Sequence, residues 1–409
     1  MRTDQSLPED ARPSHPPIDL SGVKGAMVQM GAESLEPTFS FFTRDLGFRV
    51  EAIFPADNPR NAVISGHGIT LQLTVGQPNS LGCLTLLCDD PLAVALGQRE
   101  VVAPNGVLVR FTYADPPIRA PENAQALVFS GGADATDWTI GRAGMRYRDL
   151  LPDRQGGAFI ASHIRILDGG PVPDYVHWHK VRFQMIFCRK GWVRVLYEGQ
   201  GGPIEMRAGD CVLQPPMIRH RVLECAAGAE VIEIGAPAEH ITVADHQLSL
   251  PSADHPPDHL FGGQRFVLHD AAAASWQAWR APGYECQDTG IAAATAGLAG
   301  VRVVRQRPCA DSAPTVQVHS TEFCFYFVLA GEMDFAHAGG VRRLRRDESV
   351  TVPAELAYSF RPLGEDLRFL EVTLPADVGL ASSALSGQPS IGGFKSEAQH
   401  PSQWMEGEG

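Results

Sequence analysis

The sequence predicts a mainly β protein: two tandem β-barrels that follow a smaller α+β domain. Its 409 residues are too many for a single small core, so two or three domains are expected. Two intervals of 12 and 11 residues also occur twice in the second part of the chain. They separate His179 from Gly191 and His319 from Gly331, then Gly209 from His220 and Asp347 from Tyr358. Matching intervals at both ends of a long segment indicate duplication.

The α+β domain is predicted at residues 24–115. Apolar runs give a strand (AMVQM), a helix (Glu36–Leu46) and three further strands (FRVEAIF, NAVISG and ITLQLTV), in a βαβββ-type order. A shorter second half has a strand (CLTLLC), a short helix (Pro91–Leu96) and a hairpin around a Pro-Asn-Gly turn, where Asn-Gly supplies the positive φ angles of a tight turn.

The remaining boundaries follow from composition. The polar, proline-rich residues 1–23 predict a flexible arm, and the proline-rich stretch at 116–121 predicts a linker. We assign residues 116–250 to the first barrel, 251–382 to the second, and the Ser- and Gly-rich residues 383–409 to an extended tail.

Charge and composition exclude several function classes. A formal charge of −13 argues against nucleic acid or an anionic membrane surface as a partner. No apolar stretch approaches the roughly 20 residues that span a bilayer. The N-terminus lacks the basic and apolar regions of a signal peptide, and eight cysteines without a Cys-x-x-Cys pair are typical of buried, reduced thiols. We therefore expect a cytoplasmic protein.

Three histidines and a glutamine have the spacing of a metal site. In the segment HWHKVRFQ, His177 and His179 point to the same side of a strand because side chains alternate. Gln184 returns to that space after a short turn, and His220 follows a Gly-Asp turn and a Pro-Pro pair. Transition metals favour two or three converging imidazoles, so we predict a divalent metal at His177, His179 and His220.

This pattern resembles the cupin family. Its first motif matches at Gly169, Gly170, His177, His179, Gln184 and Gly191, and its second at Gly209, Asp210, Pro215 and His220. The resemblance implies double-stranded β-helix (jelly-roll) barrels and a tandem, bicupin arrangement. Most metal cupins carry glutamate at the position of Gln184, so this site resembles those of three-histidine dioxygenases in the family. Gln184 is then a fourth ligand, a hydrogen-bond donor to substrate, or a residue that orients a ligand histidine. The alternative is a metal-free cupin whose histidines line a polar pocket.

The N-terminal segment FFTRDLGFRVEAIFPADNP resembles the vicinal oxygen chelate superfamily of glyoxalases and dioxygenases, in which βαβββ modules pair. Members carry metal ligands on their inner strands. The comparable positions here are Gln29, Gln72 and Arg110, which make a poor ligand set. This unit is therefore predicted to be a binding or scaffolding domain.

The second barrel has lost most of the motif. Alignment of the two copies places Gln317 at His177, Cys324 at Gln184 and Tyr358 at His220, while His319 matches His179. We predict a structural role for this barrel.

A three-histidine site leaves the double charge of the metal unneutralised, which favours an anionic substrate. Our leading hypothesis is a non-haem dioxygenase that uses O₂ to cleave a C–C bond in a small oxyanion, such as a diketone, an enol or a hydroxylated aromatic acid. Fe(II) is the favoured metal, with Cu, Mn, Ni or Zn as alternatives. Arg182 could pair with a substrate carboxylate, and Glu233 could act as a base. A lyase, isomerase or hydrolase that acts by Lewis-acid enolisation, and a non-catalytic binding protein, remain alternatives. Exposed edge strands predict a homodimer or a higher homo-oligomer.

Overall fold

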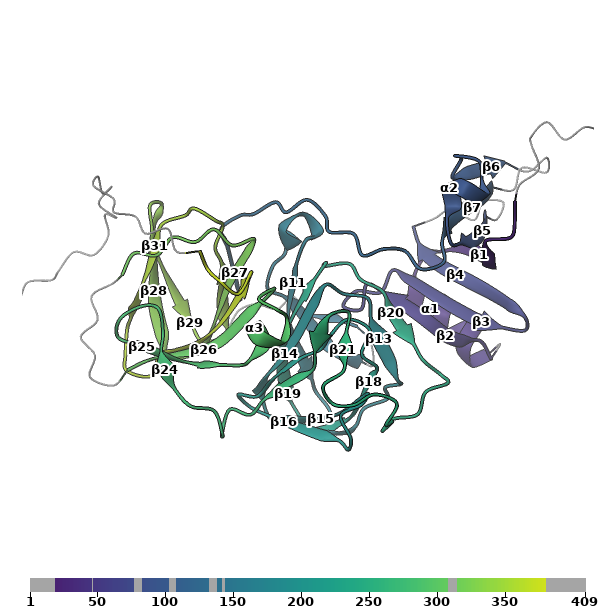
Figure 1. The fold of residues 1–409 in the computed structure, drawn as a ribbon. Helices are drawn as coiled ribbons and strands as arrows, with labels where there is room; N and C mark the ends of the chain where they lie inside the picture. Colours follow the sequence, from purple (N-terminus) through teal and green to yellow (C-terminus); the bar gives the residue numbers. More distant parts are fainter. Residues whose placement is uncertain are drawn as a thin grey trace, which may run out of the picture.

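The computed structural model describes residues 19–45, 47–76, 83–102, 108–131, 138–141, 144–307 and 315–379. Most of the predicted arm 1–23, the Pro-Asn-Gly turn and the predicted tail 383–409 lie outside these ranges. Figure 1 shows the first barrel in the middle, with the second barrel on one side and the N-terminal domain on the other. The mainly β class predicted from the sequence is confirmed.

The N-terminal domain has two short helices, and its strands continue a sheet of the first barrel through the pairing of β2 with β20 (Thr242–Ala244). Its elements are β1 (Val23–Ala32), α1 (Leu35–Ser40), a π-helical turn (Phe41–Asp45), β2 (Arg49–Phe54), β3 (Asn61–Gly66), β4 (Ile69–Val75), β5 (Cys83–Cys88), α2 (Pro91–Val94), β6 (Glu100–Val102) and β7 (Leu108–Tyr113). The strand order is β2-β3-β4-β1-β5-β7-β6, with β1 parallel to β4 and β5 parallel to β7. Each half thus places its first strand beside its last. The likeness to vicinal oxygen chelate domains stays a prediction.

Two facing sheets form the first barrel. The strands are β9 (Thr139–Ile140), β10 (Arg146–Asp149), β11 (Ile160–Ile166), β12 (Gly170–Pro171), β13 (His177–His179), β14 (Phe183–Lys190), β15 (Trp192–Tyr197), β16 (Ile204–Arg207), β17 (Cys211–Leu213), β18 (His220–Cys225), β19 (Ala229–Ala236) and β20 (Thr242–Ala244). One sheet has the order β17-β14-β19-β11-β10-β9 and the other β16-β15-β18-β13-β20. A 3-10 turn (Arg154–Gly157) precedes β11.

The second barrel repeats the order of the first of these sheets strand for strand, while its described residues form three strands in the other sheet. After a small hairpin, β21 (Leu260–Phe261) with β22 (Gln264–Arg265), and strand β23 (Val267–His269), it comprises β24 (Gln277–Ala278), β25 (Tyr284–Asp288), α3 (Ile291–Ala294), β26 (Gly300–Gln306), β27 (Phe323–Ala330), β28 (Glu332–His337), β29 (Gly340–Arg345), β30 (Glu348–Thr351), β31 (Tyr358–Pro362) and β32 (Arg368–Leu374). Its sheets run β24-β25-β26-β32-β27-β30 and β29-β28-β31.

The two barrels exchange edge strands. Strand β8 (Val128–Gly131) precedes the first barrel in sequence but pairs with β30 of the second. Strand β23 precedes the second barrel but pairs with β17 of the first. Each barrel therefore closes an edge of the other, which removes unpaired backbone groups from both.

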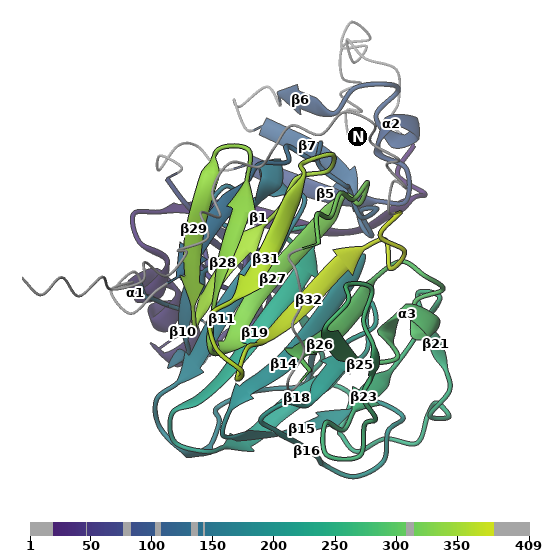
Figure 2. The same ribbon diagram turned by 90° about the vertical axis from the view of Figure 1, so that its left-hand side faces the viewer.

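The largest apolar core lies between the barrels. It joins residues of β11, β14 and β19 to residues of β26, β27 and β32, and the rings of Phe159 and Phe323 stack at 4.4 Å. Figure 2 views this arrangement with the second barrel in front, its strands β27 and β32 over β14 and β19. Burial of apolar area drives this association, so the barrels form one unit.

Two further sequence predictions concern the state of the cysteines and membrane-spanning segments. The described residues hold seven cysteines, all free thiols and six of them buried, as predicted. Among the helices of the described ranges, none is long and apolar enough to cross a membrane.

Candidate metal centre

The three predicted ligand histidines meet inside the first barrel. His177 and His179 lie on β13 and point to the same side, and His220 begins the neighbouring antiparallel strand β18, in register with His177. All three are buried, and their ligand nitrogens lie within 4.8 Å of one another. Their ring centroids are 4.2 to 5.1 Å apart. The period-2 alternation of β13 and its pairing with β18 produce this convergence.

Neighbouring groups contact the Nδ1 atom of each ring. The Nδ1 atoms of His177 and His220 lie 2.8 and 3.0 Å from backbone carbonyl oxygens, and that of His179 lies 2.9 Å from Thr242 Oγ1. A carbonyl oxygen can only accept, so Nδ1 of His177 and of His220 carries the proton. In the neutral form of these two rings the lone pair is then on Nε2. Held in this way, the rings match the usual second contacts of metal-binding histidines.

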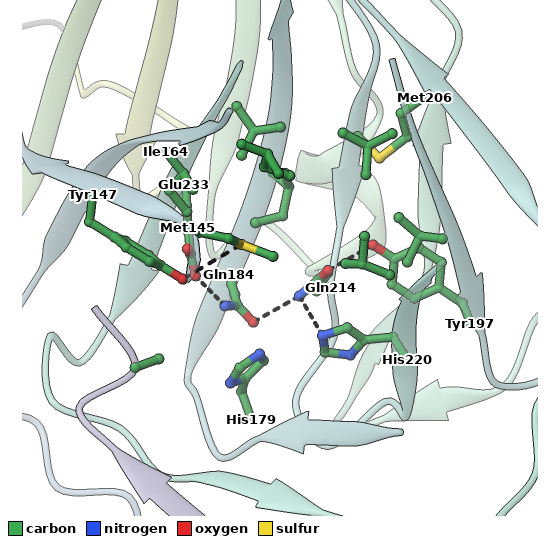
Figure 3. A pocket seen from close by; sticks show the side chains of 17 residues that line it. Met145, Tyr147, Ile164, His179, Gln184, Tyr197, Met206, Gln214, His220 and Glu233 are labelled. Carbon is green, nitrogen blue, oxygen red and sulfur yellow. Dashed lines mark hydrogen bonds between the residues drawn. The ribbon is translucent and has the colours of Figure 1, made fainter. Parts of the chain in front are cut away.

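A chain of hydrogen bonds connects the histidines with Glu233. Figure 3 shows Gln184 and Gln214 between Glu233 and His220. Gln184 Nε2 donates to Glu233 Oε1 at 2.6 Å, and its Oε1 accepts from Gln214 Nε2 at 3.1 Å. Gln214 Nε2 also lies 3.5 Å from His220 Nε2, and its Oε1 accepts from Tyr197 at 2.7 Å. Gln184 thus contacts Glu233 and Gln214, and its role as a fourth ligand, a donor to substrate or an orienting residue stays a prediction.

His179 and His220 line a cavity of about 80 Å³ between the two sheets of the barrel. Its walls are mostly aliphatic, and Glu233 is the one carboxylate among them. Tyr197 lies on β15 against His220, with ring centroids 5.6 Å apart, and burial raises its pKa well above the ordinary value. The phenol therefore stays protonated and donates to Gln214. The cavity suits a small substrate that presents one polar end to the histidines and an apolar remainder to the walls.

The predicted residue Arg182 is not brought to this cavity. Its guanidinium donates to Glu322 of the second barrel at 2.6 Å, and it does not line the pocket. Arg182 lies in the turn between β13 and β14, and that turn faces the neighbouring barrel. Glu233, in contrast, does reach the cavity wall.

Sequence reasoning did not identify Gln214, Tyr197 or Thr242. Gln214 had a local signal, because it stands directly before Pro215 and Pro216 in the second motif. Thr242 had none, because its contact with His179 depends on the pairing of β13 with β20, which are more than 60 residues apart.

The second barrel carries a fixed cation at the corresponding place. An isolated bridge joins Gln317 to Tyr358, the same register that joins His177 to His220. The guanidinium of Arg280 donates to Gln317 Oε1 at 2.9 Å and to the Tyr326 hydroxyl at 2.7 Å, and pairs with the fully buried Glu371. Within the ranges described, the three first-barrel histidines are the one group of three potential metal ligands that converges. The second barrel thus holds an internal positive charge where the first gathers histidines.

The three polar residues singled out in the N-terminal domain also meet. Gln29 and Gln72 are register partners on β1 and β4, and Arg110 donates to Gln29 Oε1 at 3.3 Å while it pairs with Glu100 at 2.7 Å. These polar side chains bind one another or neighbouring polar groups, and they form no metal-ligand set among the described residues.

Several solved structures are similar to this chain at a distance. Protein Ylba from E. coli is 10% identical, with a TM-score of 0.44 over 63% of this chain and 95% of that one. A mutant of Bacillus subtilis oxalate decarboxylase is 13% identical, with a TM-score of 0.46 over 66% and 82%. Lactobacillus farciminis oxalate decarboxylase, a formate complex, is 12% identical, with a TM-score of 0.45 over 64% and 90%. No protein-family model and no curated protein match the chain. Similarity this low carries no conclusion about activity.

Proposed function

We propose that His177, His179 and His220 bind a divalent transition metal and that the protein is a metal-dependent enzyme. One observation carries this proposal: three buried imidazoles converge to within 4.8 Å while their Nδ1 atoms contact other groups. Without a cation, three polar rings packed together would be costly to bury. The donor set fits such a metal, because imidazole nitrogen is a favoured ligand of iron, copper, nickel and zinc.

We further propose an iron-dependent dioxygenase. Three neutral ligands leave an Fe(II) ion with its double charge, and such an ion supplies a binding point for an oxyanion and for the electron exchange with O₂. The substrate class is a small diketone, enol or hydroxylated aromatic acid. For a 1,3-diketone, one C–C bond breaks and both atoms of O₂ enter the products, a carboxylic acid and a 2-oxo-aldehyde. Cu, Mn, Ni and Zn remain alternatives.

The residues of the chain have distinct roles in this proposal. Glu233 accepts the proton that a diketone or a phenol loses on becoming an oxyanion, and Gln184 holds the carboxylate toward the cavity. The Ile218 carbonyl holds His220 through Nδ1, and the ring of Tyr197 packs against it. The aliphatic walls exclude water, which strengthens the attraction between the oxyanion and the metal.

Metal content tests the first part of the proposal. His179→Ala removes one ligand, and His319→Ala changes the aligned histidine of the second barrel as a matched control. Elemental analysis of protein purified without oxygen should find metal in wild type and in His319→Ala, with a large loss in His179→Ala. Equal metal content in the two variants would refute the site.

Oxygen consumption tests the second part. An O₂ electrode should record uptake with acetylacetone or with dihydroxybenzoates in the iron-loaded protein, matched by loss of substrate. Turnover without O₂ uptake would instead place the protein among Lewis-acid lyases, isomerases or hydrolases. Ligand binding at the metal without turnover of any tested compound would favour a binding protein.

A further inference from the structure

The cavity of the first barrel has one wall residue from another domain. Ala56, in the loop that follows β2 of the N-terminal domain, lines the cavity together with His179, Gln184 and Glu233. In Figure 3 the purple ribbon of that domain passes beside the pocket. Every other lining residue comes from the first barrel. The N-terminal domain therefore takes part in the pocket, although its own polar cluster lies elsewhere.

Strand pairing fixes the position of this domain relative to the histidines. Ile53 of β2 is the register partner of Thr242 on β20, and Thr242 is the register partner of His179 on β13. Ile53, Thr242 and His179 therefore lie in one line across three neighbouring strands of the sheet, and His179 is a candidate metal ligand. Thr242 is fully buried, and its hydroxyl contacts His179 Nδ1. A loop that starts directly after β2 is held in register with the metal centre.

A buried ion pair anchors the loop itself. Asp57, which is 8% exposed, pairs with Arg154 of the first barrel. The same guanidinium donates to Asp149 at 3.2 Å, and Asp149 accepts from the Leu151 N–H at 2.9 Å. Paired and hydrogen-bonded charges of this kind hold two segments in one geometry. Ala56 is thereby fixed between the ladder of β2 and the anchor at Asp57.

The loop packs closely against the first barrel. A Cβ atom placed on Gly141 would lie 2.4 Å from the ring of Tyr147 and 3.2 Å from the carbonyl oxygen of Ala56. Gly141, Tyr147 and the loop therefore pack without spare volume. Tyr147 lines the cavity as well, with its hydroxyl toward the Gln184–Glu233 pair (Figure 3).

We propose that the N-terminal domain forms one wall of the pocket and that Ala56 limits the size of the ligand that reaches the histidines. This inference rests on the metal site proposed above, and it assigns to the N-terminal domain a role in substrate selection. The small side chain of Ala56 leaves space for the ligand, while a larger one would narrow the cavity.

Size-graded carboxylates provide the test. In Co(II)-loaded protein, the visible spectrum reports binding of acetate, butanoate and hexanoate. Ala56→Leu should weaken hexanoate binding by about tenfold, as expected for overpacking, and leave acetate binding nearly unchanged. Ala56→Gly should shift the preference toward hexanoate. Ala93→Leu, which adds the same atoms to an exposed position on α2 of the same domain, should leave the series unchanged.

Xenon binding to the metal-free variants separates this inference from the metal proposal, because xenon enters apolar cavities without a metal. Xenon NMR should show reduced binding in Ala56→Leu and wild-type binding in Ala93→Leu. If wild type takes up no Co(II), the metal proposal fails and the xenon result still tests the wall. An unchanged hexanoate-to-acetate ratio, or unchanged xenon binding in Ala56→Leu, would overturn the inference.

Discussion

Removal of the internal cation of the second barrel should destabilise the protein strongly. Arg280→Met deletes the guanidinium that pairs with Glu371, a carboxylate with no solvent exposure. Burial opposes the charge of Arg280, but neighbours led by Glu371 raise its pKa above the ordinary value. In the variant, the buried carboxylate of Glu371 loses its ion-pair partner. The Tyr326 hydroxyl and Gln317 Oε1 each lose the hydrogen bond that Arg280 donates.

The size of the effect follows from what remains around Glu371. Breaking a buried ion pair costs about 3–5 kcal/mol of unfolding free energy, because the remaining charge is uncompensated. Arg302 Nη1 lies 3.4 Å from Glu371 Oε2, and Trp279 Nε1 donates to the same oxygen at 3.2 Å. These contacts offset part of the loss, so we expect a value of about 3 kcal/mol.

Arg305→Met is the matched control. Arg305 lies in the same barrel and its guanidinium is 3.8 Å from the ring centre of Trp276, as that of Arg280 is 4.1 Å from Trp279. Its partner Glu285 is part-exposed, so the loss should stay below about 1 kcal/mol. Because both variants lose a cation–π contact, the difference between them reports the buried carboxylate together with the hydrogen bonds to Gln317 and Tyr326.

Urea unfolding followed by tryptophan fluorescence measures both variants, since Trp276 and Trp279 report on the second barrel. The double variant Arg280→Met, Glu371→Gln should recover at least about 1 kcal/mol over the single one, because no buried charge remains. If Arg280→Met costs no more than Arg305→Met, the guanidinium does not compensate Glu371 and the account of this barrel is wrong.

Three further predictions concern pH, catalysis and assembly. Burial, reinforced by Arg280, lowers the pKa of His319 to about 4, so the native state keeps this ring neutral while the unfolded chain protonates it near pH 6.5. Stability should therefore fall by about 2 kcal/mol from pH 7.5 to pH 5, and urea unfolding of His319→Gln should lack this component. Glu233→Gln should keep its metal by elemental analysis yet turn over about 10²-fold more slowly or worse, whereas wild-type rates would exclude Glu233 as the base. Light scattering should give the mass of at least two chains, because edge strands such as β29 are commonly covered; a monomer across a tenfold concentration range would contradict this.

Local patterns in the sequence predicted part of the histidine cluster. The alternation in HWH predicts that His177 and His179 share a face, and the repeated intervals predict that Gln317 and Tyr358 replace His177 and His220. The structure bears out both placements, through β13 and through the bridge of Gln317 with Tyr358. The strand period can be read from a few neighbouring residues. Duplication can be read from intervals that recur later in the chain.

The surroundings of the cluster were decided only by the tertiary structure. Thr242 behind His179, Ala56 at the cavity wall and Arg280 beside Gln317 each come from segments far away in the sequence. Arg182 shows the same limit in reverse: it is close to the motif in sequence, yet the turn that carries it faces Glu322 of the second barrel. The sequence by itself determined which side chains share a strand face. Which strands and domains meet that face depends on sheet pairing and on burial of apolar area, and neither has a local signature.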